Sequence, residues 1–478
     1  MEKISQILKA DYHKTGKSKS YFLHTYGCQL NENDGEKIAG ILEATGYKPA
    51  KTLKEADFIV LNTCSVREHA DERLFGNLGA IKHLRQQRPD LMVALCGCMM
   101  MQPGHVSRVT RYFSFVDLIF GPQDIHRLPE MLYQRLISGQ KQYDAGQEDV
   151  LAEGLPIRRE RRFRALCSIM YGCNNFCTYC IVPYTRGRER SRMPEDILNE
   201  LRGLADSGYR EVMLLGQNVN SYGKDIQDAR VRIDFADLLA AVADLGFYRI
   251  RFLTSHPKDI TEKLLSVMAE HESIERHLHL PLQSGSNRIL ERMNRQYTRE
   301  QYLQIVQRAR RLMPDLFIST DLIVGFPGET EKDFEDTLDV MREARFESAF
   351  TFLFSKRTGT PAAEMPDQID EEVMKARFAR LVELQNKLSL EANKRFEGRW
   401  VDVLVEGPSL KEDKVISGRT SQNQLVNFTV PDLQLLPAEL LSPEGCIRKN
   451  ALEGHLVKVR ITEAKTFSLV GTGEAWQT

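Results

Sequence analysis

Short apolar runs alternate with longer amphipathic stretches in the N-terminal part of the chain. The runs have the length of buried parallel strands, and the stretches between them have the length of helices. We expect strands at 21–25, 58–62 and 92–95 and helices at 36–46 and 72–88. This βαβ alternation predicts a doubly wound parallel α/β domain at residues 20–136. Residues 140–160 are polar and without periodicity, and we expect a linker there.

A second α/β region is predicted at residues 159–393, with amphipathic stretches such as 194–207 and 299–312 between its apolar runs. This spacing favours a full or partial (β/α) barrel, whose chemistry lies at the carboxyl ends of the strands. Its expected strands are 211–215, 249–253, 277–282, 317–324 and 349–354.

The character of the chain changes after a long helical stretch at 371–395. Residues 394–473 are β-rich and interspersed with Gly and Pro, which predicts a small β-barrel of the kind that often binds oligonucleotides. A purely structural β cap is the alternative. The expected strands include 400–405, 425–430 and 455–461, and residues 431–452 form a longer insertion than such a barrel needs.

Length and composition narrow the class of protein. A chain of 478 residues exceeds the ~250–300 at which single cores stop growing, so we expect two or three domains. No stretch approaches the ~20 apolar residues of a membrane span, and the first residues lack the layout of a signal peptide, so we expect a soluble, cytoplasmic protein. In a reducing compartment, nine cysteines point to metal binding or catalysis rather than disulfides.

Net charge is −1, so any nucleic-acid contact must be local. Arginines are dense at 158–164 and again at 186–192, on either side of a cysteine cluster. A solvated surface is the plain interpretation of such runs, but their position around a candidate metal site favours a polyanionic substrate.

The cysteine cluster consists of Cys173, Cys177 and Cys180, with three and then two residues between them. Structural zinc normally takes four protein ligands, and no fourth Cys or His lies nearby. Three thiolates on a four-iron cluster leave one iron open, and the amino and carboxylate groups of S-adenosylmethionine can chelate that iron. The spacing therefore predicts a radical enzyme that cleaves S-adenosylmethionine.

A second group of cysteines follows the predicted N-terminal strands. Cys28, Cys64 and Cys98 each come just after a strand, and the carboxyl ends of parallel strands meet at one edge of a sheet. Three sulfurs could thus face one metal centre. We expect the remaining cysteines to be small buried hydrophobes; these are Cys96, Cys167 and Cys446.

Several motifs carry a family resemblance. Residues 171–192 resemble the radical S-adenosylmethionine methylthiotransferases, most closely the MiaB group. The N-terminal segments 25–31, 62–64 and 97–98 and the central segments 254–257, 283–286 and 321–329 resemble other signatures of that family, and the tail resembles its TRAM domain.

The resemblance implies two [4Fe-4S] clusters, one on the 173–180 cysteines and an auxiliary one on Cys28, Cys64 and Cys98 that provides the inserted sulfur. It implies methylthiolation of C2 of N6-isopentenyladenosine at position 37 of tRNA, with the anticodon stem-loop as partner. That C2 hydrogen is neither acidic nor hydridic, which is why radical chemistry is needed. A low-potential electron donor such as flavodoxin or ferredoxin is also implied, and we expect a monomer.

Other residues at strand ends are candidates for the cofactor and substrate site. Arg186 is the expected charged group within it, whereas Arg188, Arg190 and Arg192 are expected to meet RNA. Tyr179 and the residues at the predicted barrel rim are candidates for binding S-adenosylmethionine, with a glycine turn and ordinary packing as the alternatives; the rim residues are Gly216, Asn218, Ser255, His256, Gln283, Ser284, Val324 and Gly325.

Two other functions compete with this interpretation. Related enzymes methylthiolate threonylcarbamoyladenosine in tRNA or an aspartate of a ribosomal protein, whereas the residues around the cysteine cluster, 168–172 and the arginines after Pro183, favour the isopentenyl substrate. A zinc-stabilised RNA-binding protein without catalysis is the second alternative, and it would be colourless.

Overall fold

The computed structural model describes residues 1–65, 69–144, 150–228, 230–409, 415–430 and 451–477. These form two compact units. Unit 1 comprises Met1–Glu160, Met170–Asn174 and Ile181–Arg192. Unit 2 comprises Arg161–Ile169, Asn175–Cys180 and Met193–Thr478. Each unit is described separately below.

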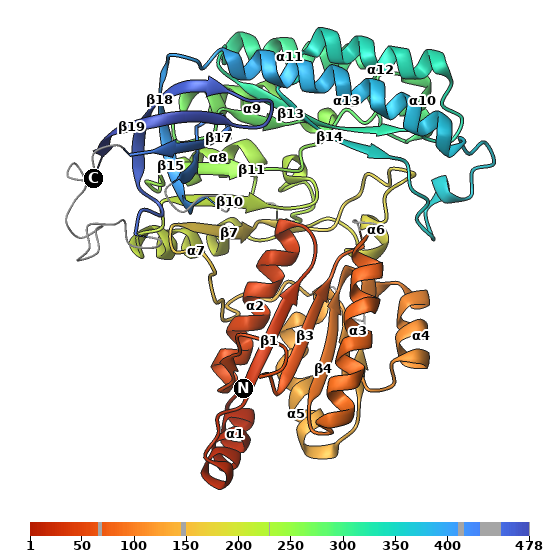
Figure 1. Cartoon of the computed structure of the whole chain (residues 1–478), viewed down its shortest axis with the longest axis vertical. Helices are drawn as coiled ribbons and strands as arrows, with labels where there is room; N and C mark the ends of the chain where they lie inside the picture. Colours follow the sequence, from red (N-terminus) through yellow and green to blue (C-terminus); the bar gives the residue numbers. More distant parts are fainter. Residues whose placement is uncertain (66–68, 145–149, 229, 410–414, 431–450, 478) are drawn as a thin grey trace. The chain divides into compact units, whose positions relative to one another are not determined.

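Unit 1 is built on a sheet of six parallel strands in the order β2-β1-β3-β4-β5-β6. Its strands β1, β3 and β4 lie side by side in Figure 1. Every residue of β3 and β4 is buried, as expected for central strands covered on both faces. The strand order reverses between β1 and β3, which is where open α/β sheets bind ligands. The strands are β1 Ser20–Thr25, β2 Lys48–Pro49, β3 Phe58–Thr63, β4 Met92–Gly97, β5 Leu118–Phe120 and β6 Gln142–Asp144.

Helices cover both faces of this sheet. Val60 packs in one hydrophobic cluster with residues of α1, α2 and α5, whereas its neighbour Ile59 packs in another with residues of α3 and α4. This alternation follows from the two-residue period of a strand. The helices are α1 Glu2–Thr15, α2 Gln29–Thr45, α3 His69–Gln87, α4 Pro103–Tyr112 and α5 Leu128–Ser138.

Two local expectations for unit 1 were wrong. The predicted linker contains β6, whose Gln142 pairs with Leu118 of β5, so part of that polar segment completes the sheet as an edge strand. Helix α2 begins at Gln29, about two turns before the predicted start at residue 36. Its first turns are polar and therefore lack apolar periodicity, yet Asn31 and Asp34 there are buried.

Unit 2 contains an open (β/α) barrel. Two three-stranded parallel sheets, β7-β10-β11 and β12-β13-β14, are joined by a parallel bridge between Ile250 and Ile274. The six strands thus follow chain order, which confirms the predicted partial barrel. They are β7 Arg164–Ser168, β10 Glu211–Leu215, β11 Arg249–Phe252, β12 His277–His279, β13 Phe317–Val324 and β14 Ser348–Leu353.

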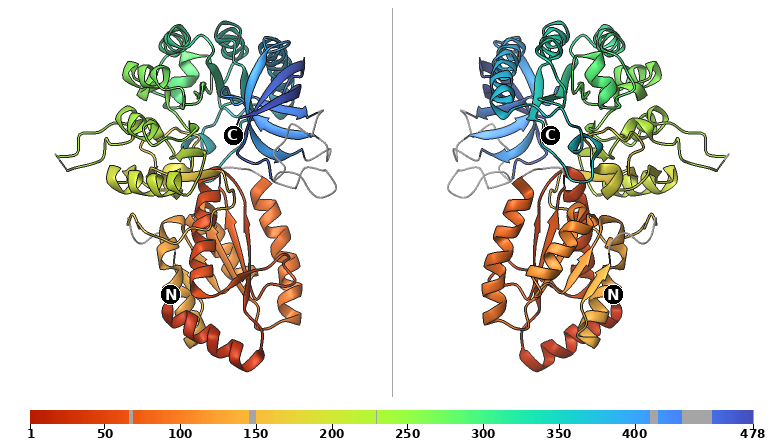
Figure 2. Two further views of the ribbon diagram at one scale, coloured as in Figure 1. Left: turned by 90° about the vertical axis from the view of Figure 1, so that its left-hand side faces the viewer. Right: turned by 90° about the vertical axis from the view of Figure 1, so that its right-hand side faces the viewer.

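Helices lie outside these strands (Figure 2). They are α7 Pro194–Asp206, α8 Phe235–Ala243, α9 Glu262–Glu270, α10 Asn287–Arg292, α11 Arg299–Leu312 and α12 Glu331–Ala344. A further long helix, α13 Glu371–Lys394, packs against β13 and β14 and leads into the last part of the chain. None of the described helices is long and apolar enough to cross a bilayer.

The last part of unit 2 is a closed five-stranded barrel in the order β15-β16-β17-β19-β18, as the β-rich tail predicted. Two of its strands, β16 and β19, were not predicted. The strands are β15 Trp400–Pro408, β16 Ile416–Arg419, β17 Leu425–Thr429, β18 Leu456–Ala464 and β19 Leu469–Gln477. Cys446 and residues 431–450 of the predicted insertion lie outside the described residues.

A buried charge network joins the amino ends of β10 and β11 to this C-terminal barrel. Arg251 lies 3.1 Å from Glu275 and 3.5 Å from Glu211, and all three side chains are at most 3% exposed. Arg251 also donates to Asn423 Oδ1 at 2.7 Å, in the turn between β16 and β17, and Arg249 donates to the last carbonyl of β16 at 3.0 Å. The C-terminal barrel therefore attaches where the strands begin, opposite the carboxyl ends at which the candidate site residues lie.

Candidate active site

The three N-terminal cysteines follow β1, β3 and β4, and glycines allow their loops to approach closely. Gly27 has φ +119°, and a Cβ there would lie 2.5 Å from the Cβ of Cys64. Gly97 has φ +95°, and a Cβ there would lie 2.3 Å from the carbonyl oxygen of Thr63. No side chain larger than hydrogen fits at either position, because the backbone is left-handed and the space is occupied. These glycines let the loops bearing Cys28, Cys64 and Cys98 converge.

Asn31 and Arg186 lie among these thiols. Asn31 Nδ2 donates to the carbonyls of Tyr26 and Thr63, at 3.0 and 2.8 Å, so it ties together the loops after β1 and β3. Its Oδ1 lies 4.0 Å from Cys28 Sγ and 3.7 Å from Cys98 Sγ. The same oxygen accepts a 2.6 Å hydrogen bond from Arg186.

Arg186 is 3% exposed, and its guanidinium contacts two further partners. Its Nε donates to Cys98 Sγ at 2.9 Å, and its Nη1 lies 2.7 Å from Asp34 Oδ2. A fixed cation at a sulfur favours the thiolate, which is the form that binds metal. The structure thus places Arg186, which the sequence analysis expected within the site, against Cys98.

The thiols differ in acidity. A hydrogen bond with Cys64 and the charge of Arg186 lower the pKa of Cys28 to about 5, against the opposing effect of desolvation. Burial raises the pKa of Cys98, and Arg186 partly offsets that rise. Cys96 is fully buried in the core, and burial holds its pKa well above the ordinary value, as suits a structural residue.

These residues fit an iron–sulfur cluster by their chemistry. The ligands of an iron–sulfur cluster are thiolates, and the protein commonly donates hydrogen bonds to them. The fixed cation of Arg186 and the amide of Asn31 beside these thiols suit such ligands. Among the described residues, no three His, Cys, Asp or Glu side chains converge on one ion position. A cluster does not require this, because each of its cysteines binds a different iron.

The first cysteine of the 173–180 motif is held by a small hairpin in unit 1. Strands β8 Met170–Tyr171 and β9 Arg190–Ser191 pair antiparallel, and the Cys173 N–H donates to the carbonyl of Gly187 at 3.1 Å. Gly172 has φ +76°, and a Cβ there would lie 1.9 Å from the carbonyl oxygen of Arg188. The hairpin therefore requires a glycine before Cys173.

The other two cysteines of the motif are held in unit 2 by the segment after α10. The N–H of Thr178 donates to the carbonyl of Met293 at 3.1 Å, and Asn294 Nδ2 donates to the carbonyls before Cys177. The Cys180 N–H donates to the Cys177 carbonyl at 2.9 Å, which forms a tight turn between the two sulfurs. The backbone around these two cysteines is thereby fixed from two sides.

Arg295 is a residue that the sequence analysis missed. It is 5% exposed, and its Nη1 lies 3.5 Å from both Cys177 Sγ and Tyr179 Oη. Its Nη2 donates to the carbonyl of Pro281 at 2.9 Å, which fixes the guanidinium. Nothing in the local pattern marks this arginine, since only the fold carries it to the cysteines. Asn31 and Asp34 were missed too, although Asn31 follows Cys28 by one helical turn within the quoted motif.

The rim residues after β10 and β11 carry unsatisfied polar atoms. Asn218 Oδ1, Ser255 Oγ and His256 Nε2 are buried and have no hydrogen-bond partner among the described residues. Asn218 Nδ2 donates to the carboxylate of Asp259 at 2.8 Å, which orients the amide. Thr254 Oγ1 donates to the Gly216 carbonyl at 2.7 Å, so the two loops are joined.

The protonation of His256 can be worked out from its surroundings. Burial holds its pKa well below the ordinary value, so the ring is neutral. Its Nδ1 accepts from the N–H of Lys258 at 3.3 Å, so Nε2 carries the proton. The rim therefore presents a free donor at His256, a free acceptor at Asn218 and a free hydroxyl at Ser255. This set complements the carboxylate and ammonium of an amino acid.

The remaining rim residues have internal partners. Gln283 has φ +70°, and its backbone N–H and carbonyl pair with Asp321 and Ile323 of β13. Ser284 is fully buried, and its Oγ accepts from the N–H of Ser286 at 3.3 Å. The structure thus gives both residues roles in holding the loop after β12.

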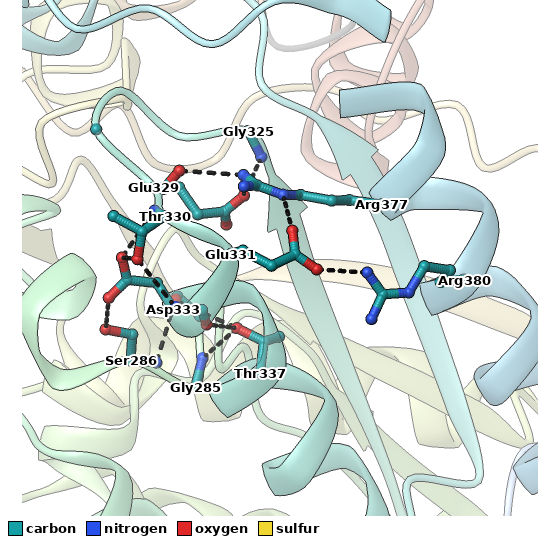
Figure 3. A network of polar contacts seen from close by, with 12 residues as sticks. Gly285, Ser286, Gly325, Glu329, Thr330, Glu331, Asp333, Thr337, Arg377 and Arg380 are labelled. Atoms are coloured by element: carbon teal, nitrogen blue, oxygen red, sulfur yellow. Dashed lines mark hydrogen bonds and ion pairs between the residues drawn. The ribbon is translucent and has the colours of Figure 1, made fainter. Parts of the chain in front are cut away.

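The loop after β13 is held by the carboxylate of Glu329 (Figure 3). This carboxylate accepts from the Gly325 N–H at 2.9 Å and from Arg377 of α13 at 3.1 Å. Burial raises the pKa of Glu329 to about 7, although both partners oppose the rise. A Cβ on Gly325 would lie 2.2 Å from the sulfur of Met374, so close packing of α13 explains this glycine. Val324 is fully buried beside it.

Several arginines of the two basic runs are paired with acids. Arg192 donates to Glu153 at 2.7 and 2.6 Å, and Arg159 lies 3.0 Å from Glu36. Both arginines lie largely within the protein. Both arginines therefore have acidic partners within the protein, and no contact with an RNA phosphate is needed to explain them.

Three family models match this chain, one in each of its three predicted domains. The Radical SAM superfamily matches residues 167–341, Uncharacterized protein family UPF0004 matches residues 20–121, and the TRAM domain matches residues 394–472. A protein of Acetivibrio thermocellus named tRNA-2-methylthio-N(6)-dimethylallyladenosine synthase is 49% identical over 474 residues, which is 98% of this chain and 94% of that protein. This chain belongs to that synthase family. A relative of the same name from Carboxydothermus hydrogenoformans is 49% identical over 455 residues, covering 95% of this chain and 99% of the relative.

Solved structures support the fold. The radical S-adenosylmethionine methyltransferase TsrM from Kitasatospora setae, with cobalamin and a [4Fe-4S] cluster bound, has a TM-score of 0.54 at 15% identity over 73% of this chain and 77% of its own. The cobalamin-dependent S-adenosylmethionine radical enzyme OxsB, with aqua-cobalamin and S-adenosylmethionine bound, has a TM-score of 0.50 at 13% identity over 77% of this chain and 61% of its own. At such identities the likeness concerns the fold alone.

Proposed function

We propose that this chain methylthiolates C2 of N6-dimethylallyladenosine at position 37 of tRNA by radical S-adenosylmethionine chemistry. The observation that carries the proposal is the near-full-length identity to synthases of that name, in a chain whose cysteines form two separate groups. The TRAM-domain match to the C-terminal barrel supports RNA as the substrate.

Cys173, Cys177 and Cys180 are the proposed ligands of the cluster that binds S-adenosylmethionine, and Cys28, Cys64 and Cys98 those of an auxiliary cluster. Bound there, a reduced four-iron cluster and S-adenosylmethionine together supply a radical able to take hydrogen from an unactivated carbon. The auxiliary site would hold the inserted sulfur, and S-adenosylmethionine would also supply the methyl group.

The chain's own residues position these groups. The free donor of His256 suits the cofactor's carboxylate, and the free acceptor of Asn218 suits its ammonium group. Arg186 neutralises the thiolate of Cys98 and anchors it through Asp34. Arg295 places a second fixed cation beside Cys177, where hydrogen bonds to sulfur favour the reduced state of a bound cluster.

The proposed partners follow from the reaction. Electrons come from a low-potential donor such as flavodoxin or ferredoxin, and the substrate is the anticodon stem-loop, where a purine can be unstacked. We propose that the enzyme acts as a monomer in the cytoplasm, where its substrate tRNA is found.

Iron and sulfide content, measured with Mössbauer spectra on anaerobically reconstituted protein, tests the two sites. The Cys28/Cys64/Cys98→Ala triple variant should hold one four-iron cluster where the wild type holds two. Cys96→Ala is the matched control, since Cys96 is two residues from Cys98 but faces the core, and it should retain both clusters. One cluster in wild type and triple variant alike would remove the auxiliary site from the proposal.

Nucleoside analysis tests the substrate. A strain that lacks the gene should lose 2-methylthio-N6-isopentenyladenosine from its tRNA, and the wild-type chain should restore it. An unchanged level would refute the proposed substrate and favour threonylcarbamoyladenosine or a ribosomal protein instead.

A further inference from the structure

One face of the sheet β12-β13-β14 points into the open barrel. His277 Nε2 and His279 Nδ1 both lie 2.8 Å from Ser319 Oγ, and His277 is also 3.6 Å from Glu275 of the buried charge network. This face is therefore continuous with the network at the amino ends of the strands. Ile318 points to the opposite face and is fully buried.

The register places two aromatic side chains on the same inner face. In the register of β13 and β14, Asp321 pairs with Phe350 and Ile323 pairs with Phe352. Because side chains alternate along a strand, all four lie on the same face as Ser319. Phe350 is 58% exposed and Phe352 is 48% exposed. A single exposed apolar residue is common, but two phenylalanines at alternate positions form an aromatic surface.

A polar pair borders this surface. The ring of His279 meets that of Phe350 edge-on, with 5.8 Å between centroids. His279 Nε2 lies 3.5 Å from Asp321 Oδ1. The face thus offers two ring surfaces, an aliphatic neighbour at Ile323 and hydrogen-bonding groups at one edge. The face runs from Phe350, in the middle of β14, toward the carboxyl ends of β13 and β14, where (β/α) barrels carry out their chemistry.

We propose that Phe350 and Phe352 form a shelf that binds the prenylated purine of the substrate RNA. This inference rests on the proposed function. A flat base stacks on exposed aromatic rings, its dimethylallyl group packs against Ile323 and Phe352, and the His279–Asp321 pair meets its polar edge. The shelf determines specificity, because an adenine without the prenyl group loses the apolar contact.

The test compares Phe350→Ala, Phe352→Ala and the double variant with the wild-type holoenzyme. The probes are two synthetic anticodon stem-loops that differ only in the N6-dimethylallyl group. Tyr112→Ala is the matched control, because Tyr112 is also an exposed aromatic residue, 60% exposed, but belongs to α4 of unit 1. RNA-free reductive cleavage of S-adenosylmethionine to 5′-deoxyadenosine reports whether the cofactor site is intact.

We expect each single variant to raise the KM for the prenylated loop about tenfold, the equivalent of ~1.4 kcal/mol of lost stacking. RNA-free cleavage should stay at the wild-type level. The double variant should lose less affinity for the unmodified loop than for the prenylated loop, because the unmodified base has no prenyl contact to lose. Phe350→Tyr keeps the ring and should restore the KM, whereas Phe350→Leu should not.

Two results would overturn the inference. The first is a double variant with an unchanged KM for the prenylated loop. The second is an equal loss of affinity for both loops, which would mean general RNA contact. If the double variant fails to fold, the Tyr and Leu variants still decide, because equal KM values for them would exclude stacking. Failure of the proposed function looks different, since the wild type itself would then form no methylthiolated product.

Discussion

Replacing Arg251 with methionine should destabilise unit 2 strongly, and the loss should depend on pH. The substitution keeps most of the side chain's length but removes the cation that faces two buried carboxylates, those of Glu211 and Glu275. Removing one partner of a buried ion pair costs about 3–5 kcal/mol, because the remaining charge is uncompensated. The lost hydrogen bond to Asn423 also loosens the C-terminal barrel.

The pH dependence follows from Glu275. Burial raises its pKa from 4.5 to about 7 in the folded protein, against the lowering effect of Arg251 and Arg249. Between these values the folded state binds more protons than the unfolded state, so the free energy of unfolding falls as pH rises. Without Arg251 the folded-state pKa rises further, and the fall continues above pH 7. The cost of Arg251→Met should be about 3–5 kcal/mol near pH 8 and clearly smaller near pH 5.5, where Glu275 is protonated.

Urea unfolding followed by tryptophan fluorescence measures this effect. The chain has two tryptophans, and both lie in the C-terminal barrel, in β15 and β19. Arg308→Met is the control, since Arg308 forms an exposed ion pair with Glu262 at 3.2 Å and should cost less than about 1 kcal/mol at either pH. A loss below about 1 kcal/mol for Arg251→Met at pH 8, or an equal loss at both pH values, would refute the reasoning.

Three further substitutions test the cysteine sites. Gly97→Ala should cost at least about 1–3 kcal/mol of stability, because residue 97 has a φ of +95° and a Cβ there would meet a carbonyl of β3. Iron analysis should then show that the proposed auxiliary cluster is lost and the proposed cluster on the 173–180 motif is kept. Arg186→Gln removes the cation at Cys98 and should lower auxiliary iron content after dialysis, whereas the same change at the exposed Arg202 should not. Arg295→Gln should make the potential of the cluster on the 173–180 motif more negative in an EPR-monitored redox titration, and an unchanged potential would exclude an influence through Cys177.

Much of the fold follows from local pattern. The alternation of apolar runs with amphipathic stretches predicted the doubly wound sheet of unit 1 and the open barrel of unit 2, and both are confirmed. Strand β19 escaped prediction because Gly471 and Gly473 interrupt its apolar pattern. A Cβ at Gly471 would lie 2.5 Å from the carbonyl oxygen of Arg460, so the close approach of β18 and β19 requires a glycine there. No local sequence pattern shows that approach.

The sequence by itself determined the chemistry of the chain. The spacing of Cys173, Cys177 and Cys180 and the placement of the other cysteines after strands are local facts, and they indicate radical S-adenosylmethionine chemistry. Only the tertiary structure decided which other side chains meet these sulfurs. Arg186 lies 88 residues from Cys98 in sequence and Arg295 lies 118 from Cys177, so both contacts depend on how the loops fold back. A strand-end position predicts where a side chain lies, whereas its partners are set by long-range packing.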